Sequence, residues 1–297
     1  MTGTGREGRC SAVAIEPPPP AEIARAVSLA LAEDRAADDI TSLNTVPAEL
    51  QGRGVFVARD SGVVAGLALA AETFRQLDPN VHLSVHVEDG ARIAAGETIA
   101  VARGPVRALL QGERVALNFL QRLSGVATLT RQFVDEVSGT GVMVLDTRKT
   151  TPGLRDLEKY AVRCGGGTNH RRDLVSMAMI KDNHREALAR EGRTLAEAAA
   201  AIRSAAPGRA IEIEIDAPGQ LEDALAARPE WVLLDNMGPG EMREAARLTA
   251  GRAKLEASGG VTLATIAAIA ATGVDAISVG ALTHSAPALD ISLELSF

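Results

Sequence analysis

The second half of the chain repeats one pattern, in which a short apolar strand ends at a polar residue and a helical stretch follows. Beyond Gly139 this pattern predicts six strands, at 142–145, 178–180, 211–215, 231–234, 254–255 and 276–279. Alternation of short strands with helices is typical of a parallel sheet, because a helix must carry the chain back between parallel strands. Parallel barrels and open α/β sheets bind ligands at the carboxyl ends of their strands, so the polar strand ends predict one shared site.

The repeating region extends from about residue 118 to residue 284, roughly 165 residues, whereas a complete eight-unit barrel takes ~250. We therefore expect an incomplete parallel α/β barrel in this region. Residues 21–117 predict a separate α/β domain, with helices at 21–32 and 106–123 and β-rich runs at 54–59, 63–65, 81–87 and 98–102. Residues 1–20, which end in four prolines, are expected to form a flexible leader.

Composition limits the partners of the chain. Its 31 Lys and Arg residues and 38 Asp and Glu residues give a net charge of −7, so no overall positive field attracts nucleic acid or anionic lipid. Only seven residues are aromatic, too few to indicate a base-stacking module. Two cysteines and no export signal favour a cytoplasmic location. The uncharged run at 257–274 is interpreted as a turn and a buried helix.

The window Asp146–Asp173 carries seven Lys or Arg residues against four Asp or Glu residues. Arg155, Lys159 and Arg163 have helical spacing, and a solvated helix face with i,i+4 pairs explains them as well as a binding site does. Two other groups fit a ligand site better. Arg148 and Lys149 follow a strand end, and Arg171 follows a triple glycine that allows a loop to wrap closely around a ligand.

Arginine and lysine in one site indicate a ligand set with two kinds of anion. The guanidinium fork suits planar carboxylates, whereas the compact ammonium group suits phosphates. Lys181 is expected at a buried strand end, where an ammonium group needs an anion or forms a Schiff base. Anion binding explains the nearby cations equally well.

Acidic residues and glycines follow other predicted strands. Glu214 and Asp235 lie at neighbouring strand ends, where carboxylates could hold ribose hydroxyls, bind Mg²⁺ or face a developing cation, or else form salt bridges to the basic window. The glycine-rich loops Ser258–Gly260 and Val279–Ala281 follow the last two strands. Barrels commonly bind phosphate there through backbone N–H groups.

Several of these motifs occur together and in order: GERVALNFLQRLSG, DTRKTTPG, EKYAVRCGGGTNHR, IKDNH, EIEID, LLDNM, EASGGV and VGALTHSAPALDISL. Together they resemble the quinolinate phosphoribosyltransferases from about Ala21 to the end of the chain. The resemblance implies an N-terminal α/β sandwich domain, to which residues 285–297 return, and an incomplete α/β barrel. It also implies a homodimer in which each site is completed by the neighbouring subunit. The departures are small, among them Cys164 in place of a small polar residue and the proline-rich leader.

The resemblance also implies roles for individual residues. Arg148, Arg171 and Lys181 would bind the carboxylates of quinolinate, with Arg114 reaching across from the partner subunit. Lys149 and His170 would lie near the carboxylates and the pyrophosphate, and Glu214 and Asp235 near the ribose and Mg²⁺. Lys149, Lys181, Glu214 and Asp235 are the candidate catalytic residues. The expected phosphate neighbours are Ser258, Gly259, Gly260, Gly280 and His284.

The implied reaction joins quinolinate to phosphoribosyl pyrophosphate and gives nicotinate mononucleotide, pyrophosphate and CO₂, as in de novo NAD biosynthesis. Mg²⁺ is the only cofactor expected, because the quaternised ring nitrogen stabilises the carbanion left by CO₂. Two alternatives stay open. One is a related phosphoribosyltransferase that acts on nicotinate or another pyridine acid and releases no CO₂. The other is a protein that binds phosphorylated metabolites without turning them over.

Overall fold

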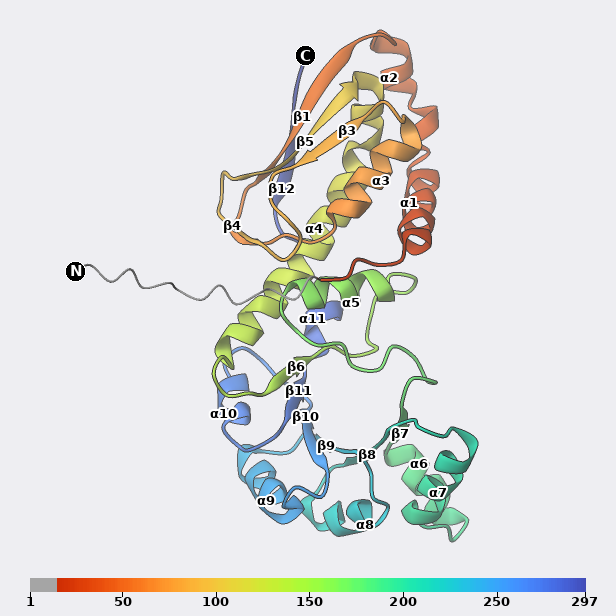
Figure 1. Cartoon of the computed structure of the whole chain (residues 1–297), viewed down its shortest axis with the longest axis vertical. Helices are drawn as coiled ribbons and strands as arrows, with labels where there is room; N and C mark the ends of the chain where they lie inside the picture. The colour runs from red at the N-terminus through yellow and green to blue at the C-terminus, as the bar shows by residue number, and fades with distance from the viewer. Residues whose placement is uncertain (1–14) are drawn as a thin grey trace, which may run out of the picture.

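The computed structural model describes residues 15–297, so the expected leader falls largely outside the described residues. The chain forms two parts stacked along its long axis, an N-terminal sheet domain and a barrel-like domain (Figure 1). In the described part of the expected leader, Ile15 packs against the barrel-side core and the Glu16 carbonyl accepts a hydrogen bond from Arg163.

The N-terminal domain is an antiparallel sheet covered on one face by helices. Its sheet has the order β12-β1-β5-β3, and β2 and β4 form a separate two-stranded ribbon. In chain order the elements are α1 (Pro20–Asp34), a 3₁₀ turn (Ala36–Asp38), α2 (Ile40–Thr45), β1 (Gln51–Ala58), β2 (Gly62–Val63), α3 (Leu67–Leu77), β3 (His82–Val85), β4 (Arg92–Ile93) and β5 (Thr98–Pro105). The expected helix at 21–32 and the four expected β-rich runs have counterparts in α1, β1, β2, β3 and β5, whereas α2, α3 and β4 were not expected.

A single long helix, α4 (Val106–Glu136), joins the two domains. It extends 13 residues beyond the helix expected at 106–123, and the expected domain boundary between residues 117 and 118 lies inside it. Its buried face explains the length, because apolar side chains continue at helical spacing beyond Leu123. Leu109 and Leu120 belong to the core of the N-terminal sheet, whereas Val126 and Phe133 belong to the core of the barrel side.

The end of the chain returns to the N-terminal sheet as β12 (Ile291–Ser296). It pairs antiparallel with β1 from Arg53↔Ser296 to Ala58↔Ile291, so the blue terminal strand lies among the orange strands in Figure 1. Before this strand, the Leu289 N–H donates to the Gln121 carbonyl and the Gln121 side chain donates to the Ile291 carbonyl at 2.7 Å. The terminal segment is therefore fastened to α4 as well as to the sheet.

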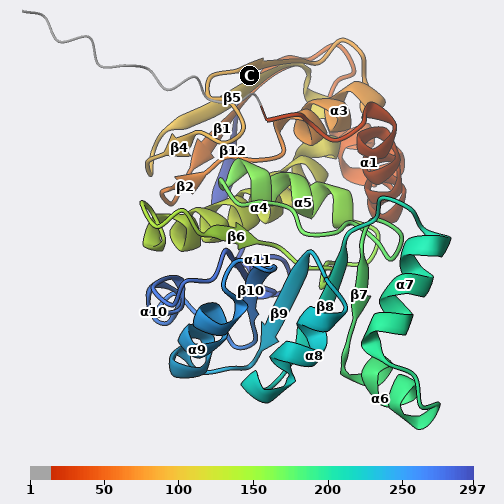
Figure 2. The ribbon, with the colours of Figure 1, turned by 60° about the horizontal axis from the view of Figure 1, so that its bottom comes forward.

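The second domain is a parallel sheet of six strands, as the sequence predicts. The strands are β6 (Met143–Leu145), β7 (Ala178–Ile180), β8 (Ile211–Ile215), β9 (Trp231–Asp235), β10 (Lys254–Ser258) and β11 (Ala276–Ser278). Their order is β6-β11-β10-β9-β8-β7, and every pair in it is parallel (Figure 2). Because β6 and β7 are the two edge strands, the barrel is incomplete. The segment between them contains α5 (Arg155–Cys164).

Helices cover the outside of this sheet. They are α6 (Asp182–Arg190), α7 (Leu195–Ala205), a 3₁₀ turn (Pro218–Gln220), α8 (Leu221–Ala226), α9 (Pro239–Thr249), α10 (Ile266–Ala270) and α11 (Ala281–His284). The uncharged run at 257–274 forms the end of β10, a turn and α10, whose Ile266 is fully buried. None of the helices within residues 15–297 is both long enough and apolar enough to cross a membrane.

A substitution in α4 tests the close approach of this helix to the returning segment. A methyl group on Gly125 would collide with the Pro287 carbonyl group and lie 3.0 Å from the Ala288 Cα. Because backbone cannot move aside as a flexible side chain can, we expect Gly125→Ala to lower the free energy of unfolding by about 1–3 kcal/mol. Denaturant unfolding measures this change.

The matched control is Gly240→Ala in the exposed first turn of α9, where an added methyl group meets nothing within 4 Å. Alanine is the better helix former, so this variant is expected to be neutral or slightly more stable. Equal stability of the two variants would contradict the proposed packing of α4 against residues 287 and 288.

Candidate active site

The carboxyl ends of the parallel strands bring together several of the residues singled out by the sequence. Lys181 follows β7, Glu214 lies near the end of β8, and Asp235 ends β9. The register places Asp235 beside Ser258, the last residue of β10. Parallel pairing aligns these ends at one edge of the sheet, as expected for a site of this fold class.

Lys181 and Glu214 form an ion pair at this edge. The Lys181 Nζ donates to Glu214 Oε2 at 2.8 Å, and the Glu214 side chain is 11% exposed. The expectation that Lys181 is buried is wrong, since its side chain is 45% exposed. The preceding Ile180 is buried, and the lysine stem extends from it toward the mouth of the barrel, where water reaches the ammonium group.

Asp235 lies in the field of the same pair. Partial burial raises the pKa of Asp235, and the negative charge of Glu214 adds to this effect, while Lys181 and Lys149 act in the opposite direction. The four side chains therefore form one cluster of two carboxylates and two ammonium groups. Carboxylate oxygens are the protein ligands that Mg²⁺ prefers, so the donor chemistry of Glu214 and Asp235 fits this ion.

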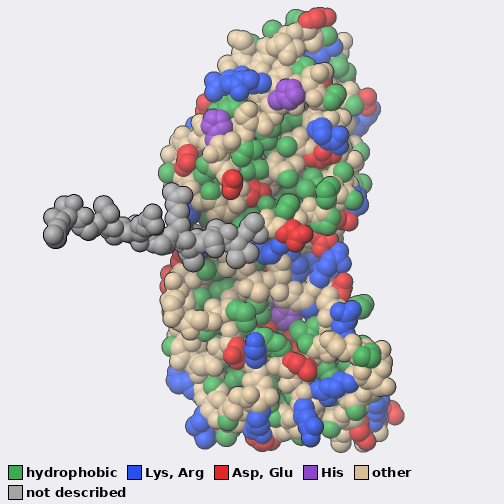
Figure 3. All heavy atoms as spheres, viewed as in Figure 1, with side chains coloured by type: hydrophobic (Ala, Val, Ile, Leu, Met, Phe, Trp, Pro, Cys, Tyr) green, Lys and Arg blue, Asp and Glu red, His purple; other side chains and the backbone are tan. Residues whose placement is uncertain are grey.

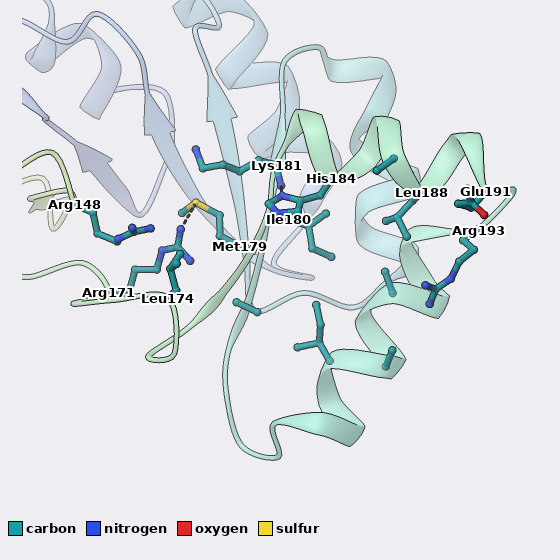
Figure 4. A pocket seen from close by; sticks show the side chains of 15 residues that line it. Arg148, Arg171, Leu174, Met179, Ile180, Lys181, His184, Leu188, Glu191 and Arg193 are labelled. Atoms are coloured by element: carbon teal, nitrogen blue, oxygen red, sulfur yellow. Dashed lines mark hydrogen bonds between the residues drawn. The ribbon is translucent and has the colours of Figure 1, made fainter.

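Three cations line one end of a cavity of about 710 Å³ beside β7. Arg148 and Arg171 lie close together at this end, and Lys181 lies next to them (Figure 4). The Nε of Arg148 is buried and has no hydrogen-bond partner. The Arg171 guanidinium donates to the Met177 carbonyl at 3.0 Å and contacts the Met179 sulfur at 3.5 Å.

This end of the cavity favours an anion. Burial lowers the pKa of Arg171, and the positive charge of Arg148 lowers it further. The negative charges of Glu212 and Glu256 offset these effects only in part, so the pKa of Arg171 stays lowered, and a bound carboxylate would raise it. The rest of the wall is mainly apolar, with Leu174, Leu188 and Ile202 among its residues. The arrangement suits an organic acid with an apolar body.

His170 lies inside the barrel, next to Arg171 in the chain. Its Nε2 is 3.3 Å from Glu212 Oε2 and 3.1 Å from Glu256 Oε2, and both carboxylates are nearly inaccessible. Burial raises the pKa of Glu212 to about 7. Potential metal-ligand atoms of the three residues lie within 4.8 Å of one another. The cluster is separate from the carboxylates expected to hold Mg²⁺.

A buried ion pair fixes the backbone beside this histidine. Lys159 Nζ lies 2.5 Å from Asp146 Oδ1, with side-chain exposures of 6% and 0%. The same lysine donates to the His170 carbonyl at 3.0 Å, and the His170 N–H donates to Asp146 Oδ1 at 2.8 Å. The solvated-face interpretation is therefore wrong for Lys159. It fails for Arg155 as well, whose Nε donates to the Thr150 hydroxyl and whose side chain is half-buried.

The glycine-rich loops lie beside the carboxylate cluster. Gly259 has a φ of 98°, and a side chain there would run into Asn236, the residue after Asp235. Gly280 is close to Lys149 and His284, since an added methyl group would lie 3.2 Å from the Lys149 Cδ and 3.1 Å from the His284 Nε2. The Thr283 hydroxyl also donates to the Lys149 carbonyl at 2.8 Å. Lys149, Gly280 and His284 thus form one neighbourhood.

Arg114 is apart from these groups within one chain. It is exposed on α4, between the buried residues Gly112 and Val115, and does not line the cavity. The single chain thus brings together Arg148, Arg171 and Lys181 in the cavity, and Lys149, Glu214 and Asp235 at the neighbouring strand ends. Charged side chains of both signs are interspersed over the face seen in Figure 3, so any anion-binding field is local.

An incomplete parallel barrel with cations and carboxylates at its strand ends defines a class of barrel proteins that bind organic anions. Comparison with known proteins identifies the group within this class. Models of the N-terminal and C-terminal domains of quinolinate phosphoribosyl transferase match residues 39–124 and 126–294. The chain therefore belongs to the quinolinate phosphoribosyltransferase family.

Individual relatives agree with this assignment. A probable nicotinate-nucleotide pyrophosphorylase (carboxylating) of Bacillus subtilis is 46% identical over 264 residues, which are 89% of this chain and 90% of the relative. The corresponding protein of Mycobacterium leprae is 43% identical over 86% of this chain and 91% of its own length. The solved nicotinate-nucleotide pyrophosphorylase of Francisella tularensis superposes with a TM-score of 0.88 at 36% identity, covering 95% of this chain and 99% of the other.

Sequence reasoning missed the interior polar groups of the barrel. The predicted strand at 211–215 contains Glu212, and the predicted strands at 254–255 and 142–145 end at Glu256 and Asp146, but none of the three was a candidate site residue. The sequence did contain a signal for Glu212. It precedes Glu214 by two residues, and alternate residues of a strand point to the same face, so Glu212 and Glu214 were expected on one face. A side chain on the same face one layer deeper must lie inside the barrel.

The Asp146–Lys159 pair gives a prediction for stability. Burial raises the pKa of Asp146 and lowers that of Lys159, so desolvation outweighs the attraction between the two charges. Removing one partner leaves the other buried without a counter-charge, and we expect Lys159→Met to cost about 3–5 kcal/mol of unfolding free energy. Arg172→Ala, which breaks an exposed pair with Asp156, is the control and should cost under ~1 kcal/mol. Similar losses in both variants would refute a special role for the buried pair.

Proposed function

We propose that this protein transfers the phosphoribosyl group of phosphoribosyl pyrophosphate to quinolinate and releases CO₂ and pyrophosphate, giving nicotinate mononucleotide for de novo NAD biosynthesis. One observation carries the proposal: Arg148, Arg171 and Lys181 line one cavity beside the carboxylates of Glu214 and Asp235. The family of the chain supports it, and the tobacco relatives named quinolinate phosphoribosyltransferase (decarboxylating) are 36–37% identical to this chain.

The cations first bring two anionic substrates together. Quinolinate carries two adjacent carboxylates, and the guanidinium groups of Arg148 and Arg171 match these two charges. Lys181 adds a third positive charge, which pairs with Glu214 in the free protein. Arg171 can turn its fork toward a carboxylate from its contacts with Met177 and Met179, and Arg148 has an unused Nε to donate. The two substrates are both anions and repel each other in solution. Cations that hold both in one fixed geometry remove this repulsion and place the reacting atoms next to each other.

The carboxylates act on the sugar side. Glu214 and Asp235 would hold Mg²⁺, which when bound to the pyrophosphate lowers the cost of its departure. Near the ribose, the same two residues offset the positive charge that develops on the sugar as the pyrophosphate leaves. Lys181 orients Glu214 in the free protein through their 2.8 Å contact. Lys149 and His284 lie beside Gly280, where the phosphates would be placed.

The bond changes follow from this placement. The quinolinate ring nitrogen attacks C1 of the ribose, and the bond from C1 to the pyrophosphate oxygen breaks. The nitrogen becomes quaternary, so the electron pair released when the bond from C2 to the carboxylate breaks is stabilised beside a positive centre. CO₂ leaves in this cleavage, and C2 then takes up a proton from water. No further cofactor is needed for this sequence.

Other expectations belong to the same proposal. We propose a homodimer in which Arg114 of one subunit completes the site of the other, because Arg114 is exposed on α4 and outside the cavity of its own chain. The expected division into a leader at 1–20, a domain at 21–117 with residues 285–297, and a barrel at 118–284 stays a prediction. The cytoplasmic location and the phosphate contacts of Ser258, Gly259 and Gly260 also stay predictions.

Removing one cation tests the binding role of the cavity. We expect Arg171→Ala to raise KM for quinolinate by about 10–100-fold, since a hydrogen bond to a charged group contributes about 1.5–3 kcal/mol. KM for phosphoribosyl pyrophosphate should change little. The control is Arg172→Ala, the neighbouring arginine that pairs with Asp156 outside the cavity. An unchanged KM for quinolinate in Arg171→Ala would count against the assignment.

Product analysis separates quinolinate from related acids. With quinolinate, phosphoribosyl pyrophosphate and Mg²⁺, we expect CO₂ and pyrophosphate to appear in equal amounts. With nicotinate, which has one carboxylate, we expect little turnover because one guanidinium would stay unpaired. Pyrophosphate release from nicotinate without CO₂ would instead favour the alternative enzyme, and binding without turnover would favour a sensor.

Subunit mixing tests the role of Arg114. In a dimer of Arg114→Ala with Lys181→Ala, one site carries both substitutions and the other carries neither. Equal mixing by reversible unfolding should therefore restore about a quarter of the wild-type activity, since half of the dimers are mixed and each has one intact site. Activity no greater than that of the separate variants would place Arg114 in its own subunit's site or outside both.

A further inference from the structure

The side chain of His170 is held by two carboxylates that come from different strands. Glu212 is in β8 and Glu256 is in β10, the strands on either side of β9. The Nε2 of His170 contacts both, at 3.3 and 3.1 Å. Glu256 is itself fixed, because its other oxygen accepts a hydrogen bond from the Ser278 hydroxyl. The ring therefore has little freedom to turn.

The other side of the same ring faces Arg171. The Arg171 N–H donates to His170 Nδ1 at 2.6 Å. The His170 N–H and carbonyl are bonded to Asp146 and Lys159, as described above. Every polar atom of His170 thus has a partner. The backbone at Arg171, from which the guanidinium extends into the cavity, is fixed through this ring.

We propose that Glu212 and Glu256 are positioning residues that set Arg171 for the substrate carboxylate by fixing the ring of His170. The inference rests on the proposed function, since it concerns how that site holds quinolinate. Neither glutamate lines the 710 Å³ cavity, and His170 is the side chain that contacts both of them. Their negative charges also act on the Arg171 guanidinium, where they partly offset the lowering of its pKa by burial. An arginine that starts from a fixed backbone loses less freedom when it binds, and its hydrogen bonds then contribute more to affinity.

The hydrogen bonds also decide between two interpretations of the cluster. A metal ion on His170 Nε2 would leave the proton of a neutral imidazole on Nδ1. The Arg171 N–H already points at Nδ1, so a proton there would face another donor. Burial lowers the pKa of His170, but hydrogen bonding to Glu212 and Glu256 outweighs burial and raises this pKa to about 9, so the carboxylates hold a proton on Nε2. The Arg171 N–H, 2.6 Å from Nδ1, disfavours a second proton on that nitrogen. We therefore assign the ring proton to Nε2, between the two carboxylates, and a hydrogen-bonding role to the cluster.

The presence of Glu212 and Glu256 inside the barrel is not explained by a need to fill space. Glu212 is fully buried, and neither of its oxygens has a hydrogen bond of good geometry. An apolar side chain of similar volume fills a barrel interior at lower cost than a buried carboxylate does. The cost of burying these carboxylates is explained by their contact with His170, a ring that the site requires.

Leucine at position 256 separates positioning from stability. We expect Glu256→Leu to raise KM for quinolinate at least tenfold, with kcat reduced less, with KM for phosphoribosyl pyrophosphate within twofold and with the melting temperature maintained. Glu256→Gln keeps an oxygen that accepts the Nε2–H bond and an amide that can donate to Ser278, so it should restore KM to within about threefold. The control is Thr249→Val, at a buried hydroxyl without a partner, where KM should stay unchanged.

Nuclear magnetic resonance tests the link to Arg171 independently of turnover. The ¹⁵N signals of the five histidines, with His170 assigned from His170→Gln, should show Nε2 protonated and Nδ1 unprotonated. The amide signal of Arg171 should move in Glu256→Leu and stay in place in Thr249→Val. A proton on Nδ1, or an Arg171 amide signal that does not move in Glu256→Leu, would overturn the inference.

The same measurements separate this inference from the proposed function. If the wild-type protein releases no CO₂ from quinolinate, the proposed function fails while the two resonance signals still report on the link. If turnover is normal and Glu256→Leu changes kcat and both KM values equally, or loses only stability, the positioning role is wrong. If Glu256→Leu does not fold, Glu212→Leu takes its place with the same expected results.

Discussion

The buried ion pair between Asp146 and Lys159 is the interaction on which the site depends. It joins the end of β6 to α5 and holds both backbone groups of His170, so it fixes the segment that crosses the open side of the barrel. Asn169 completes it by donating to Asp146 Oδ2 at 2.7 Å. Two buried charges are costly, but a network in which each is fully hydrogen-bonded is rigid. Because His170 precedes Arg171 in the chain, this network also fixes the position of the Arg171 backbone.

At the mouth of the barrel, positive and negative side chains lie at the ends of different strands. The guanidinium groups of Arg148 and Arg171 lie beside the open edge at β7, and the carboxylates of Glu214 and Asp235 lie at the ends of β8 and β9. Lys181 stands between the two groups and pairs with Glu214. A ligand with acid groups at one end and a sugar phosphate at the other matches this order. The incomplete barrel is useful here, because the missing strands leave room for the cavity.

Local patterns predicted most of the secondary structure and the candidate residues, and failed where distant segments meet. The six strands were visible because a parallel strand is short and apolar and ends at a polar residue. The role of Lys159 stayed open because helical spacing is the same for a solvated face and for a face that covers a buried acid. Lys181 was placed too deep, since burial of Ile180 says nothing about where the long side chain after it ends. The length of α4 was underestimated because its second half packs on a different core.

The sequence by itself determined the class of fold, the family, and the chemical types present at the strand ends, because periodicity and residue type are local properties of the chain. Only the tertiary structure decided which of those groups meet. Parallel register brought Asp235 beside Ser258, and the curvature of the incomplete barrel brought Glu212 and Glu256 to one imidazole nitrogen. Burial, which sets the cost of each charge, is a property of the whole packed molecule. For that reason the carboxylates behind His170 became apparent only in three dimensions.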